Sequence, residues 1–320
     1  MQRTSILLAS LFATSVVAVA APAPVVGGST TSSSDWPDVV GVISDTGRCT
    51  GTLIAPDVVL TAGHCAELEP TEVVVGANDV ETGGEHIPVK WTKAYSNWEN
   101  TYDVSIVMLA HAASASPRRI VSTCVDGKEL RDGAELTIVG YGLATASGTD
   151  NNSRLRKATI AVTDATCADT PGCNPSVSPS GEIVAGGGGV DSCFGDSGGP
   201  AYLQTASGLA LAGVVSRSID AAGPPCGGGG IYVRADKVVS WIERETGRSL
   251  TRAACTGSGG AGAGSNGTSS GSGSDGAPAD DPGHVANDDG CSVGGSAGHG
   301  VAFGAPLLLG LTIALRRRRR

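Results

Sequence analysis

The body of the sequence has few basic residues, and they do not cluster. Six of the 22 Lys and Arg residues are Arg3 and the five arginines at 316–320, and 31 Asp and Glu residues leave the whole chain with a net charge of −9. Phosphate binding requires clustered Lys and Arg side chains, so the composition argues against a nucleic-acid partner. An acidic body favours solubility and weak non-specific adhesion instead.

Metal-ligand spacing is also lacking. Zinc sites use His and Cys ligands at short, characteristic separations. Four of the five histidines have no such spacing to the cysteines: His86, His111, His284 and His299. The sequence therefore predicts neither a metal nor a cofactor.

The last quarter of the chain lacks apolar periodicity. Residues 256–290 are mostly Gly, Ser, Ala, Asn and Asp, a composition that cannot repay its ordering entropy by burying surface. We expect a disordered Gly/Ser-rich linker there. The remaining globular part has roughly 230 residues, which fits one large β domain or two barrels that share an interface.

The first 20 residues have the pattern of a secretory signal peptide. Arg3 is followed by an apolar run over 6–20 that ends in Ala18-Val19-Ala20, a small-x-small cleavage pattern. The predicted localisation is secreted, either extracellular or anchored at the cell surface. Export to an oxidising compartment makes the nine cysteines disulfide candidates. Because nine is odd, at least one cysteine has another fate.

Short β-branched runs recur between turn residues through the globular part. Regular short strands separated by turns predict an all-β barrel or sandwich. Helical features occur over 235–246, where Val238, Val239 and Ile242 share one face and Gly247 stands at the C-cap position. The predicted strands are 39–43, 52–54, 58–61, 73–75, 87–91, 105–109, 135–139, 157–162, 209–215 and 231–233.

The C-terminal tail, residues 291–320, combines Cys291, an uncharged run over 301–315 and five arginines. The run spans only ~22 Å as a helix against a ~30 Å hydrocarbon layer, and counting from Gly294 closes that gap. Terminal arginines stay cytoplasmic, which places the rest of the chain outside, with membrane contact through the tail before or instead of processing. The tail resembles the myxobacterial C-terminal sorting signal, which implies processing at an unpaired Cys291. The alternative is an ordinary tail anchor.

Three motifs follow one another in the order His, Asp, Ser. They are Thr-Ala-Gly-His-Cys at 61–65, Tyr-Asp-Val-Ser at 102–105 and Gly-Asp-Ser-Gly-Gly-Pro at 195–200. Each alone could be a core histidine or a surface turn, but together, in this order, they are specific. From Val25 to about Gly247 the chain resembles the trypsin-like (chymotrypsin-fold) serine proteases. The resemblance implies an all-β domain over 25–255, with two six-stranded antiparallel β-barrels that meet near 125–135 and a C-terminal helix.

The resemblance implies a serine endopeptidase that works through an acyl-enzyme. Ser197 would be the nucleophile, His64 its general base, and Asp103 the group that orients His64. Ser216 would donate a hydrogen bond to that aspartate, and the backbone N–H groups of Gly195 and Ser197 would form the oxyanion hole. Proteins or peptides would be the substrates, proteinaceous inhibitors would be further partners, and the chain would be a monomer. The alternative is a non-catalytic binding module on the same fold, which the complete triad disfavours.

The resemblance also implies a specificity pocket for basic side chains. Asp191 stands six residues before Ser197, where the trypsin branch has a carboxylate at the base of the S1 pocket. Gly230 matches a glycine that keeps the pocket open, and Ser216 lines it. Ser218 replaces the second usual glycine, and Arg217 replaces an aromatic residue. Cleavage after Lys or Arg is the expectation, and a non-tryptic P1 preference is the alternative.

The same resemblance implies particular disulfide pairings. Cys49–Cys65 matches the bridge beside the catalytic histidine, and Cys193–Cys226 the bridge between the walls of the specificity pocket. Cys167 departs from the family pattern, because Val184 stands at the position where its usual distal partner would be. We therefore expect Cys167 to pair with Cys173 and close a short loop. We expect Cys124 to pair with Cys255. The sequence leaves the connectivity of these last four cysteines open.

Maturation is implied by Val-Val-Gly-Gly at 25–28, which matches the family's mature N-terminus. In such zymogens, cleavage frees an ammonium group, here that of Val25, which pairs with the aspartate next to the nucleophile, here Asp196. Residues 21–24 would be a short propeptide of two X-Pro units, which a dipeptidyl peptidase could trim. The family's calcium loop is not expected, because Gly-Ala-Asn-Asp at 76–79 lacks the first acidic ligand.

Overall fold

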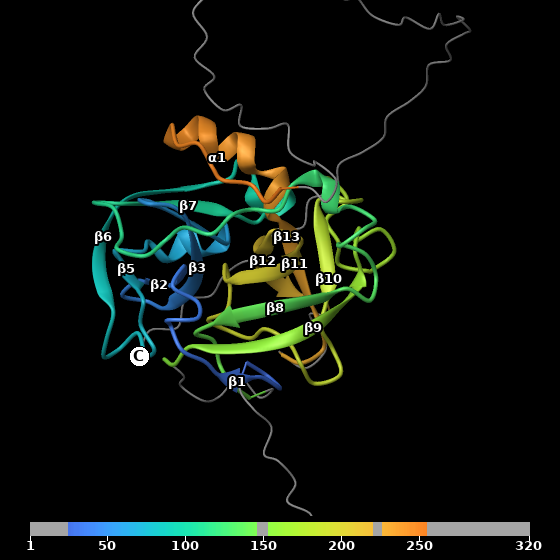
Figure 1. Cartoon of the computed structure of the whole chain (residues 1–320), viewed down its shortest axis with the longest axis horizontal. Helices are drawn as coiled ribbons and strands as arrows, with labels where there is room; N and C mark the ends of the chain where they lie inside the picture. Colours follow the sequence, from blue (N-terminus) through green and yellow to red (C-terminus); the bar gives the residue numbers. More distant parts are fainter. Residues whose placement is uncertain (1–24, 146–152, 220–225, 255–320) are drawn as a thin grey trace, which may run out of the picture. The chain divides into compact units, whose positions relative to one another are not determined.

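The structure is a computed structural model that describes residues 25–145, 153–219 and 226–254 (Figure 1). The predicted signal peptide, propeptide, linker and tail, together with Cys255 and Cys291, lie outside the described residues. Within the described part, no helix is both long enough and apolar enough to cross a membrane.

The first half of the domain is a closed antiparallel barrel with the strand order β2-β3-β4-β7-β6-β5. Its strands are rich in Val, Ile and Leu, which suit a pleated surface buried on one face. Val40, Leu53, Val59 and Val107 are buried in its interior. The strands are β2 Val39–Ile43, β3 Arg48–Ala55, β4 Val58–Thr61, β5 Glu72–Val75, β6 Glu85–Ala94 and β7 Ser105–Leu109.

The second half is a second barrel, in which β9-β10-β13-β12-β11-β8 is closed by pairing of β8 with β9. Burial alternates along β9, where Ala158, Ile160 and Val162 face the interior. A two-residue strand, β1 Ser29–Thr30, pairs with β9. The barrel strands are β8 Glu135–Gly140, β9 Arg156–Asp164, β10 Glu182–Ala185, β11 Pro200–Thr205, β12 Gly208–Ser218 and β13 Gly230–Arg234.

A third hydrophobic cluster joins residues of both barrels. It includes Trp36, Tyr141 and Tyr202, and the rings of Trp36 and Tyr202 stack with centroids 5.3 Å apart. Asp38 is buried there and accepts hydrogen bonds from Tyr202 and from Arg118 (Nε–Oδ2 2.9 Å). Burial of this charge requires both the cation and the hydrogen bonds. The cluster therefore fixes the two barrels against each other.

The helix predicted near the end of the domain is present. After a 3₁₀ turn, η4 Ala235–Lys237, the α-helix α1 runs over Val239–Thr246 and ends at Gly247, whose φ of 66° is left-handed. Trp241 and Ile242 are buried on its inner face, and Figure 1 shows α1 at the end of the first barrel nearest β7. In the described residues, two closed antiparallel barrels and one α-helix confirm the predicted fold.

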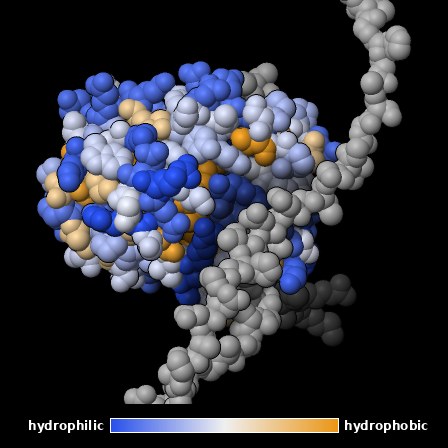
Figure 2. Space-filling model, turned by 90° about the horizontal axis from the view of Figure 1, so that it is seen from above, coloured by the Kyte–Doolittle hydropathy of each residue, from blue (hydrophilic) through white to orange (hydrophobic). Residues whose placement is uncertain are grey.

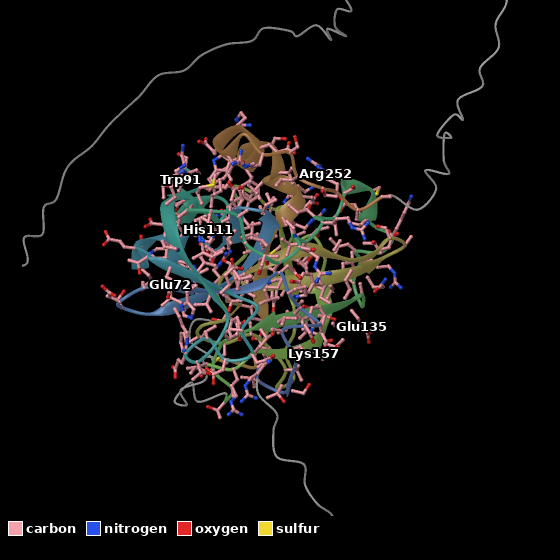
Figure 3. All side chains as sticks on the ribbon, turned by 60° about the vertical axis from the view of Figure 1, so that its left-hand side comes forward. Glu72, Trp91, His111, Glu135, Lys157 and Arg252 are labelled. Atoms are coloured by element: carbon pink, nitrogen blue, oxygen red, sulfur yellow. A yellow bond between two sulfur atoms is a disulfide. The ribbon has the colours of Figure 1, made fainter. Side chains whose placement is uncertain are left out.

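The outer surface is largely polar. The face in Figure 2 is mostly hydrophilic, with hydrophobic residues in small separate patches. Figure 3 shows charged side chains over both barrels, including Glu72 on β5 and Glu135 on β8. Among the described large hydrophobic residues, Phe194 is the exposed exception at 61 %.

Candidate active site

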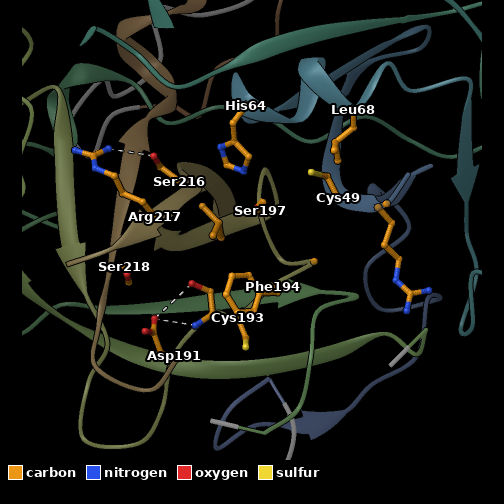
Figure 4. Close-up of a pocket in the computed structure, with 15 residues that line it drawn as sticks. Cys49, His64, Leu68, Asp191, Cys193, Phe194, Ser197, Ser216, Arg217 and Ser218 are labelled. Carbon is orange, nitrogen blue, oxygen red and sulfur yellow. Dashed lines mark hydrogen bonds between the residues drawn. The ribbon is translucent and has the colours of Figure 1, made fainter. Parts of the chain in front are cut away.

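A cavity of about 610 Å³ is lined by residues of both barrels (Figure 4). The first barrel contributes residues at the start of β3 and from η1 His64–Leu68, and the second contributes the 191–197 loop and the end of β12. Side chains far apart in the chain therefore meet at one opening. Its lining residues include His64, Asp191, Phe194, Ser197, Ser216, Arg217 and Ser218.

His64 and Asp103 lie side by side at the rim of the first barrel. His64 begins η1, directly after Gly63, where a Cβ would lie 2.8 Å from Trp98 and 2.9 Å from an Asp103 oxygen. Nδ1 of His64 is 2.9 Å from Oδ2 of Asp103, and the backbone N–H of His64 donates to Oδ1 at 2.9 Å. The carboxylate therefore fixes the position of the imidazole. Because Nδ1 faces Asp103, the other ring nitrogen, Nε2, faces away from it.

Asp103 is buried and well supplied with hydrogen bonds. The hydroxyl of Ser216 donates to its Oδ2 at 2.7 Å. Burial alone would raise the pKa of Asp103, but the hydrogen bonds and charge of His64, with the hydrogen bond from Ser216, hold that pKa below its ordinary value. The carboxylate is therefore ionised at neutral pH, as stabilisation of an imidazolium requires.

Ser197 lies on a tight turn between two glycines with positive φ, Gly195 (94°) and Gly198 (79°). A Cβ at Gly198 would lie 1.9 Å from the hydroxyl of Thr61, so only glycine lets this turn approach the first barrel. The backbone N–H of Thr50 donates to the carbonyl of Ser197 at 2.9 Å. Figure 4 shows Ser197 and His64 facing one another across the cavity mouth.

Asp196 points away from the cavity into the second barrel. Its carboxylate accepts hydrogen bonds from the backbone N–H groups of Gly142 (2.8 Å) and Cys193 (2.9 Å). A Cβ at Gly140 would lie only 2.2 Å from its Oδ1. Burial raises the pKa of Asp196 to about 7 against an ordinary 3.8, although the two backbone hydrogen bonds act in the opposite direction. This side chain therefore needs a cation to hold a charge at low cost.

Thr50 holds the loop around Gly195 from the other side, and sequence reasoning missed it. Its side chain is fully buried, donates to the carbonyl of Gly195 at 2.7 Å and accepts from the backbone N–H of Tyr141 at 3.1 Å. A threonine inside a β-strand is ordinary, so no sequence pattern points to this contact. The hydroxyl connects strand β3 to the predicted oxyanion loop.

The floor of the cavity carries one carboxylate. Asp191 is 2 % exposed and accepts hydrogen bonds from the backbone N–H groups of Ser192 (2.8 Å) and Gly229 (2.9 Å). Burial raises its pKa above the ordinary value. A Cβ at Gly230 would lie 3.2 Å from Oδ1 of Asp191, so the glycine keeps space open at the carboxylate. Ser218 lines the mouth of the same cavity.

Comparisons with known proteins agree with this geometry. The family model described as Trypsin matches residues 25–242. A protein named Trypsin from Saccharopolyspora erythraea is 32 % identical over 222 residues, which cover 66 % of this chain and 92 % of the relative. The chain belongs to the trypsin family. It is a serine-type endopeptidase, and its substrates are proteins.

Disulfides brace the loops that carry the protease's site residues. Cys49–Cys65 joins β3 to the helix that begins with His64, and Cys193–Cys226 joins the loop before Ser197 to the segment before β13. Cys167–Cys173 closes a short local loop. In the described residues, both close groups of potential metal ligands contain one of these bonded cysteine pairs, and a disulfide sulfur is not a thiolate ligand. Cys255 lies outside the described residues, so its pairing with Cys124 stays a prediction.

The N-terminal segment of the trypsin domain docks beside the pocket floor. Val25 is 1 % exposed and belongs to the core of the second barrel. The carbonyl of Val26 accepts a hydrogen bond from the backbone N–H of Asp191 at 3.0 Å. Residues 25–26 therefore contact the loop that carries the floor carboxylate.

Proposed function

We propose that the protease cleaves peptide bonds with Ser197 as nucleophile, His64 as general base and Asp103 as the group that orients His64. The observation that supports this most is the hydrogen-bonded line from Ser216 through Asp103 to His64, which ends at a cavity that also holds Ser197. His64 takes the proton of Ser197 during attack and returns it to the leaving amine. This favours catalysis over a non-catalytic binding module.

The oxyanion of the tetrahedral intermediate would be bound by the backbone N–H groups of Gly195 and Ser197. The turn that carries both is fixed from two sides, by the hydroxyl of Thr50 and by the buried carboxylate of Asp196. Because these donors are already in place, they need not reorganise during the reaction. This preorganisation is the source of the few kcal/mol by which they stabilise the transition state.

A serine-directed covalent inhibitor tests the mechanism. Ser197→Ala should lower amide hydrolysis at least ~10⁴-fold, the general factor for Ser-His-Asp proteases of this same family, and should abolish labelling. Ser34→Ala, at an exposed serine of the N-terminal segment, should leave both unchanged. Hydrolysis by Ser197→Ala within tenfold of the unaltered rate would exclude this mechanism.

For P1, we propose Lys or Arg. The carboxylate of Asp191 is buried at the floor of the cavity, and a buried anion is stabilised when a substrate cation reaches it. Gly230 leaves that approach open. A panel of Lys, Arg, Phe and Ala amide substrates is the test: strong preference for Lys and Arg is expected, and preference for Phe or Ala would favour the non-tryptic alternative.

For location, we propose that the protease is secreted as a monomer and displayed at the cell surface. The signal-like N-terminus and the sorting-like tail support this proposal, as do the disulfides Cys49–Cys65, Cys167–Cys173 and Cys193–Cys226, since disulfides are typical of oxidising compartments. Mass spectrometry of the mature protein should find an N-terminus at Val25 and an end near Cys291. An intact polyarginine end would refute processing of the tail.

A further inference from the structure

Arg217 stands next to Ser216 on β12 and lines the cavity (Figure 4). Its two terminal nitrogens carry four N–H groups, and the structure gives all four an acceptor. Nη1 donates to Glu182 Oε1 at 2.8 Å and to Ser216 Oγ at 3.1 Å. Nη2 donates to Gly172 carbonyl at 2.8 Å and to Glu182 Oε2 at 3.1 Å. The planar guanidinium is therefore held in one orientation.

Glu182 explains why a cation is needed at this place. Glu182 is fully buried on β10, and its Oε2 also accepts a hydrogen bond from the backbone N–H of Asn174 at 2.7 Å. A buried carboxylate without a cation would be strongly destabilising. The bidentate pair with Arg217 supplies the cation and leaves one Nη1 hydrogen directed at Ser216.

That hydrogen determines what the Ser216 hydroxyl can do. A guanidinium only donates, so toward Arg217 the Ser216 oxygen must accept. The single hydroxyl hydrogen is then left for Asp103 Oδ2, 2.7 Å away. A serine without such a partner could turn its hydrogen elsewhere, but here its direction is set.

We propose that Arg217, held by Glu182, is a positioning residue for catalysis: it orients the Ser216 hydroxyl toward Asp103 and so tunes how strongly Asp103 holds His64. The inference rests on the proposed triad. Lysine cannot replace Arg217, because one ammonium cannot span Glu182, Ser216 and Gly172 with the same fixed geometry. The titratable and charged groups that bear on this arrangement are His64 on η1, Tyr102 and Asp103 before β7, Glu182 on β10, Asp191 on the cavity floor and Arg217 on β12.

The expected effects have opposite signs for the two partners. In Arg217→Lys, Asp103 loses an oriented hydrogen bond and attracts the imidazolium more strongly. The acid limb of kcat/KM should then move up by about half a pH unit, with kcat about fivefold lower. In Glu182→Gln, a negative charge near the site is removed while the arginine remains. Removal of this charge lowers the acid limb, and release of Arg217 offsets part of that shift while Ser216 is present.

A double-mutant cycle separates positioning from other roles. Rates are normalised to active sites counted with a covalent serine inhibitor, so misfolded enzyme does not contribute. If Arg217 acts through Ser216, then Arg217→Lys in a Ser216→Ala background should leave the acid limb of the single Ser216→Ala variant unchanged. Arg248→Lys is the matched control, because Arg248 forms a bidentate pair with Asp57 at the surface.

Additive shifts in the cycle, or an unmoved acid limb in both Arg217→Lys and Glu182→Gln, would overturn the proposal. If Arg217→Lys gives no titratable active sites, Glu182→Gln is compared with and without Ser216→Ala: a larger downward shift of the acid limb in the Ser216→Ala background supports the proposal, and equal shifts in the two backgrounds refute it. Failure of the triad itself would appear separately, as inhibitor labelling that survives Ser197→Ala.

Discussion

Burial of the Asp196 carboxylate should make the stability of an unprocessed chain fall as pH rises. The folded pKa of about 7 exceeds the ordinary value of 3.8, so the folded state binds more protons than the unfolded state between these two values. The contribution of protonated Asp196 to the free energy of unfolding is therefore complete below about pH 4 and is lost as pH rises through about 7. A difference of about three pKa units corresponds to about 4 kcal/mol of unfolding free energy.

A chain that begins at Val25 should not show this loss. Its new ammonium group would give Asp196 a cation, lower the pKa of that carboxyl and keep it ionised without a large penalty. The comparison uses two inactive Ser197→Ala proteins, one beginning at Val25 and one retaining residues 21–24. Urea unfolding from pH 4 to 8 gives the free energy of each. We expect the longer form to lose several kcal/mol more across this range.

Asp196→Asn supplies the control for this experiment. It removes the titrating group, so the two forms should then have parallel profiles. Parallel profiles in the presence of Asp196 would refute the reasoning, because they would mean that the new N-terminus does not reach the carboxylate.

Two substitutions in the cavity give further expectations. Gly230→Ala places a methyl group 3.2 Å from Oδ1 of Asp191, so kcat/KM for Arg substrates should fall about 10- to 100-fold with less effect on Ala substrates, measured with matched amides. Thr50→Val keeps the shape but removes a hydroxyl with two hydrogen bonds, one of them to the carbonyl of Gly195. Because a buried unpaired group costs about 1–3 kcal/mol, we expect kcat to fall about tenfold with little change in KM. Unchanged kcat would show that the loop does not need this contact.

Much of the fold was predictable, because its signals are local. β-branched runs located β2, β4 and β7, and the 3.6-residue spacing with Gly247 located α1. Strand β11, Pro200–Thr205, was not predicted, since it begins with proline and alanine, which are both depleted in strands. It is a strand because β8 and β12 pair with it on both sides, which is tertiary information.

The candidate site divides in the same way. His64, Asp103 and Ser197 could be named from the sequence because each lies in a motif whose residue types the chemistry requires. The contacts of Thr50 and Glu182 could not, because both residues are ordinary within strands and their partners lie 145 and 35 positions away. Sequence reasoning noted that Arg217 replaces an aromatic residue, but only the structure shows that a buried carboxylate holds it.

The four glycines at 186–189 all have a positive φ, between 65° and 109°. They stand in the chain directly before Val190 and Asp191. Glycine loses more conformational freedom on ordering than any other residue, at a backbone cost of ~1–2 kcal/mol each. This loop is anchored by hydrogen bonds from Gly189 to Gly227 and from Asp191 to Val26. Release of Val26 would remove one of these anchors, and any loss of loop order would weaken apparent substrate affinity in proportion to the fraction of molecules whose loop is ordered. We therefore expect substrate binding in this protease to weaken when its N-terminal segment is not docked.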